Sequence, residues 1–285
     1  MSKAPPSTAR LRKIGRTLRR IRVDAGYTLK TAGRMIERSG SSLSLIEKGE
    51  QQLRLRDLKH ILDVYEVEPV THRALMTLAA QQQQHCGLEE FRETVSREAL
   101  DIASLENSAS MIALAEIGVI PGLMQTESYA RSVIRAGLVG EEATKADGYL
   151  AFRLARQQRT LHRPDAPRLR IIVDEAALRR VRGGRRVMHD QLTHLLENSH
   201  RENVTLQVLP FECETDPTYV GPFQILEIGC PAILSAVLID HLTGRWILEE
   251  DSDVTFYLSK FAHISKTALN DADSRTMLQR ILSDL

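Results

Sequence analysis

Two adjacent acidic residues, Asp174 and Glu175, follow the apolar run RLRIIV, where a strand is expected to end and a helix to begin. Carboxylates in such a position can act as general acids or bases. Helix capping explains the same pair equally well, because Asp is a favoured N-cap residue and Glu is stabilised near the positive end of a helix. We therefore expect structural roles for both residues and keep a carboxylate-dependent enzyme as an alternative.

The histidines and cysteines lack the spacing of a metal site. His189 and His194 lie five residues apart, whereas two histidines that share a metal on one helix are separated by four. Cys86, Cys213 and Cys230 are isolated from one another, without a CxxC pair. The sequence also has neither a GxSxG elbow nor a phosphate-binding P-loop. We expect no metal, no cofactor and no enzymatic activity, with a metal-dependent enzyme left as an alternative.

The first eighty residues are expected to form five short helices. Leu11, Ile14, Leu18 and Ile21 recur at helical spacing, and Gly26 can end that helix in the left-handed conformation. Apolar spacing and Ser or Thr capping residues then predict helices over residues 29–36, 40–48, 55–65 and 71–84. The short second and third helices, joined by a tight turn, are typical of a helix-turn-helix, which reads DNA.

The distribution of charged residues also separates the first part of the chain from the rest. Residues 1–60 contain 15 Lys and Arg against 5 Asp and Glu, a net charge of +10. The totals of 38 basic and 37 acidic residues leave 23 and 32 for the remainder, a net charge of −9. This asymmetry favours a polyanion as the partner of the first part. The three isolated cysteines and the absence of a signal peptide or a long apolar stretch favour a cytoplasmic protein.

The stretch AGYTLKTAGRMIERSGSSLSLIEKGE resembles the XRE-type, phage-repressor-like helix-turn-helix. The positions that match the family pattern are Gly26, Thr28, Gly33, Ser39, Leu43, Ser44, Ile46, Glu47 and Gly49. The resemblance implies that Glu47 pairs with an arginine late in the first helix, a place that Arg22 occupies. We therefore predict a structural ion pair between Arg22 and Glu47.

Contacts with bases are expected to be few, because the third helix offers mainly serines where the family usually reads DNA. A serine hydroxyl can bond to any base, whereas each bidentate pair of the Arg–guanine kind gives about 1–3 kcal/mol of discrimination. Phosphates can instead be bound by basic side chains and by backbone N–H groups at helix starts. The expected DNA-binding residues are Thr28, Lys30, Arg34, Ser39, Gly40, Ser41, Ser42, Ser44, Leu45, Lys48, Arg19 and Arg20. A helix-turn-helix that binds protein instead of DNA is the alternative.

The rest of the chain predicts an α+β fold, with an N-terminal all-α five-helix domain and a C-terminal mixed domain. We place the helix-turn-helix domain at residues 1–80, a connecting helix or linker at 81–110 and the C-terminal regulatory and partner-binding domain at 111–285. One long helix is expected near residues 88–102 and another over 141–161. The apolar runs GPFQILEIG, AILSAVLID and GRWILEE predict an antiparallel meander, followed by two terminal helices.

This second part resembles the C-terminal domain of actinobacterial XRE regulators that are WhiJ-like and antitoxin-like. The runs that carry the resemblance include IPGLMQTESYAR, FRLARQQRTLHRPDAPRLRIIVDEAALRR, GGRRVMHDQLTHLLE, NVTLQVLPF, GPFQILE and LTGRWILEE. The resemblance implies a transcriptional regulator that is often encoded beside a small partner protein. It implies no chemical mechanism for the domain.

We therefore expect a homodimeric DNA-binding regulator, a repressor or antitoxin-like protein, whose C-terminal domain binds a small partner protein. Double-stranded DNA is the other expected partner. The alternative is a regulator whose C-terminal domain binds a small molecule. In that case we expect a pocket lined by apolar strand residues, with Tyr129, Arg153 or Trp246 at its mouth.

Overall fold

The computed structural model describes residues 8–83, 87–213, 221–230, 232–241 and 244–285. The chain divides into two compact units: the first comprises residues 1–85 and the short segment 229–234, and the second comprises the rest. Residues 8–83 of the first unit form helices, and the second unit contains a mixed sheet with helices, so the expected α+β fold is confirmed. Residues 87–110, part of the segment expected to connect the domains, belong to the second unit.

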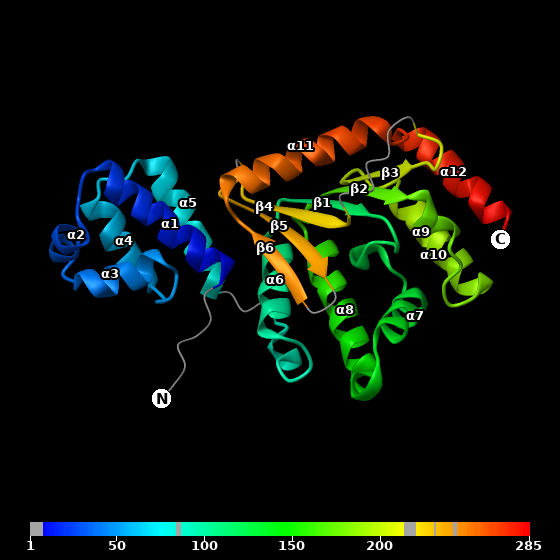
Figure 1. Cartoon of the computed structure of the whole chain (residues 1–285), viewed down its shortest axis with the longest axis horizontal. Helices are drawn as coiled ribbons and strands as arrows, with labels where there is room; N and C mark the ends of the chain where they lie inside the picture. Colours follow the sequence, from blue (N-terminus) through cyan, green and yellow to red (C-terminus); the bar gives the residue numbers. More distant parts are fainter. Residues whose placement is uncertain (1–7, 84–86, 214–220, 231, 242–243) are drawn as a thin grey trace. The chain divides into compact units, whose positions relative to one another are not determined.

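The first unit contains five helices in its described residues (Figure 1). They are α1 (Ala9–Asp24), α2 (Leu29–Met35), α3 (Gly40–Glu47), α4 (Leu55–Val64) and α5 (Pro69–Gln83). Their apolar faces meet in a core that includes Ile14, Leu18, Leu43, Ile46 and Leu62, each at most 3% exposed. This packing, more than helix propensity, stabilises helices of only two turns such as α2.

Glycine allows α1 to lie very close to the end of α3. A Cβ atom on Gly15 would stand 2.5 Å from the carbonyl oxygen of Ile46. A Cβ atom on Gly49, whose φ of +71° already favours glycine, would stand 2.8 Å from the backbone of Arg12. The orientation of α3 relative to α1 therefore depends on two residues without side chains.

The second unit is built on a six-stranded sheet with the strand order β3-β2-β1-β4-β5-β6. The strands are β1 (Met111–Glu116), β2 (Arg168–Asp174), β3 (Val204–Leu209), β4 (Phe223–Ile228), β5 (Leu234–His241) and β6 (Gly244–Leu248). The strands β1, β2 and β3 pair in parallel, whereas β1 with β4 and β5 with β6 are antiparallel. The expected run of three apolar strands thus forms one half of the sheet.

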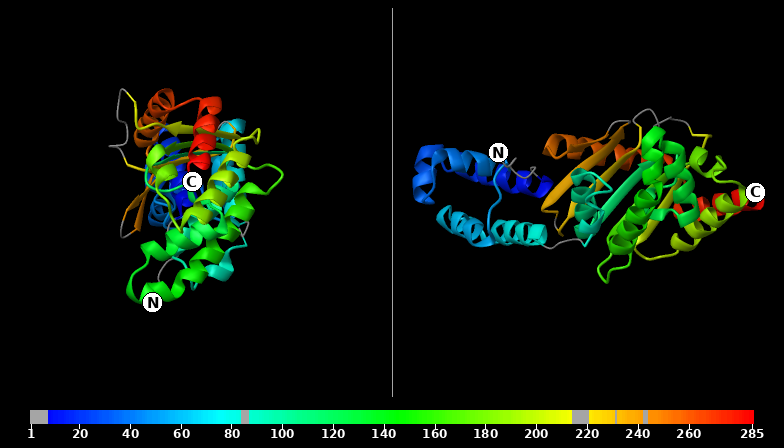
Figure 2. Two further views of the ribbon diagram at one scale, coloured as in Figure 1. Left: turned by 90° about the vertical axis from the view of Figure 1, so that its right-hand side faces the viewer. Right: turned by 90° about the horizontal axis from the view of Figure 1, so that it is seen from below.

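Helices cover both faces of this sheet (Figures 1 and 2). The helix α11 (Asp251–Thr267) lies along one face, where Phe261 packs with Ala113, Ile225 and Val237 in one apolar cluster. The helices α6 (Arg97–Ser108) and α8 (Ala146–Leu161) lie on the other face. The remaining helices are α7 (Glu127–Gly137), α9 (Glu175–Arg179), α10 (Arg185–Asn198) and α12 (Asp271–Ser283), with the short helices η1 (Glu89–Phe91), η2 (Gly122–Met124) and η3 (Gly140–Lys145).

Two expected helices are each divided. The prediction of a single helix near residues 88–102 is wrong. The short helix η1 ends at Phe91, and α6 begins separately at Arg97, because the Ser96 hydroxyl caps it by accepting from the Ala99 N–H at 3.1 Å. The helix expected over 141–161 starts as η3 and becomes α-helical only at Ala146. Local capping and turn chemistry override an apolar period that looks continuous.

Candidate functional site

The helix pair α2 and α3 has the local structure of a helix-turn-helix. Both helices are capped, because the Thr28 hydroxyl accepts from the Thr31 N–H and the Ser39 hydroxyl accepts from the Ser42 N–H, each at 3.1 Å. The turn between them passes through Glu37, which has a positive φ of 56°. Thr28 and Ser39 are both exposed, so both helix starts lie at the surface of the unit, where an anion can approach them.

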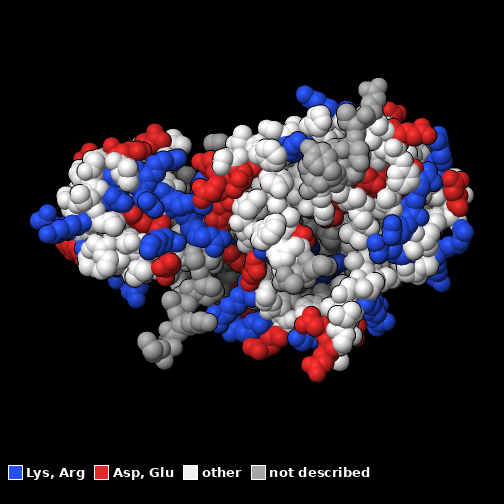
Figure 3. Space-filling model, in the orientation of Figure 1, with Lys and Arg blue, Asp and Glu red and all other residues white. Residues whose placement is uncertain are grey.

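The expected DNA-binding residues all lie at the surface of the first unit, exposed or half-buried. Arg19, Arg20, Lys30, Arg34 and Lys48 are exposed on three different helices or their ends. Figure 3 shows Lys and Arg side chains gathered over this unit, with acidic side chains near its upper edge. The structure therefore offers a basic surface that can meet phosphates without prior rearrangement.

The small side chains of α3 differ in how much they can still donate. The Ser42 hydroxyl donates to Gln51 Oε1 at 3.1 Å, and the hydroxyls of Ser39 and Ser41 lie 3.0 Å apart. Ser44 is half-buried, and Leu45 is 42% exposed. Because the hydroxyls of Ser39, Ser41 and Ser42 already have partners, base reading by this helix would rely on the exposed Leu45 and on serine hydroxyls that exchange these contacts for DNA.

The ion pair expected between Arg22 and Glu47 is present and buried. Arg22 Nε donates to Glu47 Oε1 at 2.6 Å, and Arg22 Nη2 donates to Oε2 at 2.9 Å. The hydrogen bond to Glu47 raises the pKa of Arg22 despite the opposing effect of burial. Arg22 also donates to the Tyr27 carbonyl at 2.7 Å. One guanidinium therefore ties α1 to α3 and to the turn before α2.

The acidic neighbours Asp174 and Glu175 are engaged in local structure. Asp174 caps α9 by accepting from the Ala176 N–H at 2.7 Å. Glu175 accepts from Arg179 Nε at 2.5 Å and from the Phe211 N–H at 2.9 Å. Asp174 caps α9, and Glu175 bonds within α9 and to the backbone of Phe211, so local structure accounts for both carboxylates.

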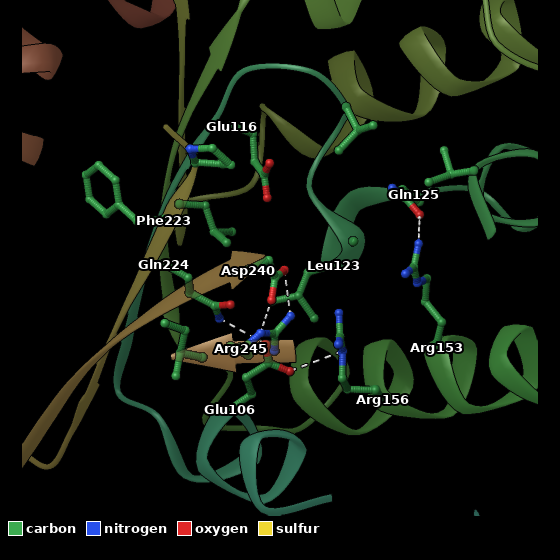
Figure 4. A pocket seen from close by; sticks show the side chains of 16 residues that line it. Glu106, Glu116, Leu123, Gln125, Arg153, Arg156, Phe223, Gln224, Asp240 and Arg245 are labelled. Carbon is green, nitrogen blue, oxygen red and sulfur yellow. Dashed lines mark hydrogen bonds and ion pairs between the residues drawn. The ribbon is translucent and has the colours of Figure 1, made fainter. Parts of the chain in front are cut away.

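A polar cavity of about 250 Å³ lies between the sheet and the helices α6 and α8 (Figure 4). The alternation of side chains along a strand selects its lining, because residues two apart share a face. Leu114 and Glu116 of β1 line it, as do Leu238 and Asp240 of β5. The register places Gln224 of β4 opposite Leu114, on the same face.

Two ion pairs are found within the lining of the cavity. Arg156 Nε lies 3.2 Å from Glu106 Oε2, at an angle outside hydrogen-bond geometry, while Gln224 Nε2 donates to Glu106 Oε1 at 2.9 Å. Arg245 donates through Nη2 to Asp240 Oδ2 at 2.7 Å and through Nε to Oδ1, a bidentate pair between directly opposed residues of β5 and β6. These four charges compensate one another.

Arg153 is held in the wall by one hydrogen bond, from its Nη1 to Gln125 Oε1 at 2.6 Å. Gln125 is itself fixed, because its Nε2 donates to the Ile120 carbonyl at 2.7 Å and its own carbonyl accepts from Gln157 at 2.9 Å. Burial lowers the pKa of Arg153 to about 10, helped by the neighbouring Arg156. The buried Gln125, itself held by the half-buried Gln157, thus orients a guanidinium that makes no other hydrogen bond within the described ranges.

Glu116 ends β1 and points into the cavity (Figure 4). Burial, together with the nearby Asp240, raises its pKa to about 7 against the opposing effect of Arg245 and Arg153. In the part of the chain that the structure describes, its carboxylate forms neither a hydrogen bond nor an ion pair within contact distance. A desolvated carboxyl without a partner is the usual origin of such a shift and is frequent at functional sites.

Sequence reasoning identified one of these residues. Of the three side chains expected at a pocket mouth, Arg153 lines the cavity, but Tyr129 is fully buried and Trp246 is 60% exposed outside the lining. The lining is also more polar than expected. The sequence analysis missed Glu116, Asp240 and Glu106. Glu116 and Asp240 each follow an apolar residue by two positions on the same face of a strand, and this pattern could have identified them.

Comparison with family models assigns both units. Residues 13–75 match a helix-turn-helix domain, and residues 99–280 match a domain of unknown function, DUF5753. The chain belongs to the DUF5753 family. The helix-turn-helix match supports a DNA-binding regulator. No curated protein and no solved structure matches the chain.

The DUF5753 match spans β1 to β6 and most of the flanking helices, so the polar cavity is a feature of that domain. Among the described residues, no group of three or more His, Cys, Asp or Glu side chains is placed to hold a metal ion. The same residues contain no helix long and apolar enough to cross a membrane.

Proposed function

We propose that this protein is a homodimeric transcriptional regulator that binds double-stranded DNA through α2 and α3. The exposed basic surface of the first unit, around a capped helix-turn-helix held by the Arg22–Glu47 pair, is the observation that carries the proposal. Arg19, Arg20 and Lys48 would contact phosphates, and the small side chains of α3 would let its backbone approach the major groove.

The dimer is part of the proposal because one helix with so few base-reading groups gives little specificity. Two helix-turn-helix units, one from each subunit, would bind two half-sites. This would double the contacts with DNA and make the spacing of the half-sites a further requirement for specific binding. The resemblance to WhiJ-like and antitoxin-like regulators of actinobacteria supports a small partner protein that binds the DUF5753 domain. Such a partner would change DNA binding by changing the dimer, in line with thermodynamic linkage.

The test is DNA binding by the purified full chain to its own upstream region across a salt series. We expect tight binding whose logarithm falls linearly with the logarithm of salt concentration. Changing Arg19, Arg20 and Lys48 together to alanine should weaken binding strongly. The same change should reduce the salt slope by about 0.9 for each phosphate that the protein no longer neutralises.

In a matched control, three basic residues of α4 and α5 are changed to alanine: Arg56, Lys59 and Arg73. Each is exposed on the same unit but is not among the expected DNA-binding residues. This control should bind nearly as well as the unchanged protein. An equal weakening in both triple variants would point to nonspecific attraction. Binding by neither the variants nor the unchanged protein would favour a helix-turn-helix that contacts protein.

A second candidate function is a ligand-sensing regulator, and the polar cavity of the DUF5753 domain favours it. Such a cavity, lined by residues of β1, β4, β5 and β6 and of the helices α6, α7 and α8, can convert ligand binding into a change of domain structure. In either form of the proposal, the DUF5753 domain binds and does not catalyse, which is supported by the structural engagement of Asp174 and Glu175.

A further inference from the structure

The charges around the cavity leave two groups without full compensation. Glu106 with Arg156, and Asp240 with Arg245, form pairs within the wall. Arg153 uses one of its five N–H groups on Gln125, and Glu116 has no such partner among the described residues. Figure 4 shows Glu116 at one side of the cavity and Arg153, bonded to Gln125, at another.

We propose that this cavity binds a small zwitterion of the free amino acid type, with its carboxylate on Arg153 and its ammonium group on Glu116. The inference rests on the ligand-sensing form of the proposed function and names the class of ligand. It concerns the second unit alone, so its test needs no DNA.

Arg153 suits the carboxylate because its planar guanidinium offers parallel donors to two oxygens. Gln125 holds that guanidinium from one side, and Gln125 is only 3% exposed. The binding group is therefore positioned before the ligand arrives, which reduces the entropy that binding costs. Lysine at this place would lack both the fork and its fixed orientation.

Glu116 suits the ammonium group because its carboxylate is desolvated and lacks a cation in contact. A bound ammonium would supply that cation and favour the ionised carboxylate. Two opposite charges in one ligand are needed, because a purely anionic ligand would add negative charge beside Glu116 and Asp240. A purely cationic ligand would leave Arg153 uncompensated beside Arg156 and Arg245.

The size of the cavity agrees with such a ligand. Its volume of about 250 Å³ is below the range of about 300–1,000 Å³ that is usual for drug-sized ligands. The apolar part of the wall, from Leu114, Leu123 and Leu238, can contact a short side chain. A nucleotide or a peptide of several residues would extend beyond this volume.

The groups that face Glu116 set a sign for the pH dependence. They are Asp240 of β5, Arg245 of β6 and Arg153 of α8, with the Tyr129 phenol of α7 also near enough to interact. Because only ionised Glu116 pairs with an ammonium group, binding should weaken as the pH falls through about 7. With a free pKa of about 7, affinity at pH 6 should be about tenfold lower than at pH 8. A ligand that is only an anion would show the opposite trend.

The experiment is calorimetric titration of the full chain, without DNA, with each of the common L-amino acids. Propionate and ethylamine serve as alanine lacking one charge each. We expect at least one amino acid to bind saturably and the singly charged compounds to bind about tenfold more weakly or worse, since each removes one charged hydrogen bond. Arg153→Gln and Glu116→Gln should each weaken binding by a similar factor, and Glu116→Gln should also remove the pH dependence.

The matched control is Arg159→Gln, an exposed arginine on α8 outside the lining, which should bind like the unchanged protein. Thermal melting of each variant checks that it is folded. Saturable binding by no amino acid, binding that survives both substitutions in folded protein, or affinity that rises as the pH falls would each overturn the proposal. Any of these would leave the DNA-binding proposal intact, because that is measured separately.

Discussion

In the proposed ligand site, Glu116 would serve binding at the expense of stability. Its pKa of about 7 in the folded protein stands against an ordinary value of 4.5, because burial disfavours the charged form. Evolution of a core for stability alone would favour an uncharged side chain at the end of β1. A carboxyl without a contacting cation at this place is consistent with a partner that arrives from outside the chain.

This shift predicts that Glu116 makes folding less favourable as the pH rises. Between pH 4.5 and 7 the folded chain keeps a proton that the unfolded chain releases, so the free energy of unfolding falls over that interval and is level above it. The full decrease is at most about 3 kcal/mol. Glu116→Gln should remove this decrease, making the second unit more stable than wild type at pH 8 but not at pH 4.

The measurement is urea unfolding at several pH values, followed by the fluorescence of Trp246, the only tryptophan in the sequence. Glu141→Gln, at an exposed glutamate of η3, should leave the pH dependence of wild type unchanged. If Glu116→Gln changes stability equally at both pH values, the carboxyl has an ordinary pKa.

At the scale of elements, the recognition helix α3 is held by a charge pair and by close backbone approach. Both Arg22 and Glu47 are buried, at 8% and 6% exposure. Replacing such a pair by apolar residues can be neutral, but removing one partner leaves a buried charge uncompensated. The closeness of Gly15 to Ile46 adds no attraction of that kind, and only permits the approach.

We therefore predict that Glu47→Gln lowers the stability of the first unit by about 3 kcal/mol, because Arg22 loses its counter-charge. Hydrogen exchange followed by mass spectrometry should show faster exchange in α1 and α3, with no change in the sheet of the second unit. Glu50→Gln, at an exposed glutamate three residues later, is the control and should exchange like wild type. Unchanged protection of α3 in Glu47→Gln would mean that packing alone holds the helix.

The local elements were largely predictable. Ser or Thr caps were expected before the helices at 29–36 and 40–48, and Asp174 was expected to cap a helix; Thr28, Ser39 and Asp174 each accept a backbone N–H. Capping depends on residues two or three positions away, so it can be read from a short stretch of sequence. The division of the helix near 88–102 was missed, because the apolar residues before and after Ser96 keep a helical spacing across the break.

At the scale of the whole molecule, the proposed dimer predicts a dependence on the helical repeat of DNA. Two heads reach half-sites that face the same side of the duplex, one turn of about 10 base pairs apart or a multiple of it. Inserting about 5 base pairs between mapped half-sites should abolish tight binding, and inserting about 10 should restore part of it. Footprinting on the three DNAs measures this, and a single protected half-site with no dependence on the insertion would show a monomeric reader.

The sequence by itself determined the helix-turn-helix, its caps, the Arg22–Glu47 pair and the concentration of positive charge in the first part. These features depend on spacing along one short segment, or on a family pattern that spans it. It also predicted the strands, because alternation and turn residues are local signals.

Only the tertiary structure decided the order of the strands and the polar cavity. Glu116 and Arg245 are 129 positions apart and contribute to one site because β1 pairs with β4 and β5 pairs with β6 in a single sheet. The burial that raises the pKa of Glu116 comes from helices and strands distant in the sequence. Desolvation is a property of the assembled environment, and no local pattern encodes it.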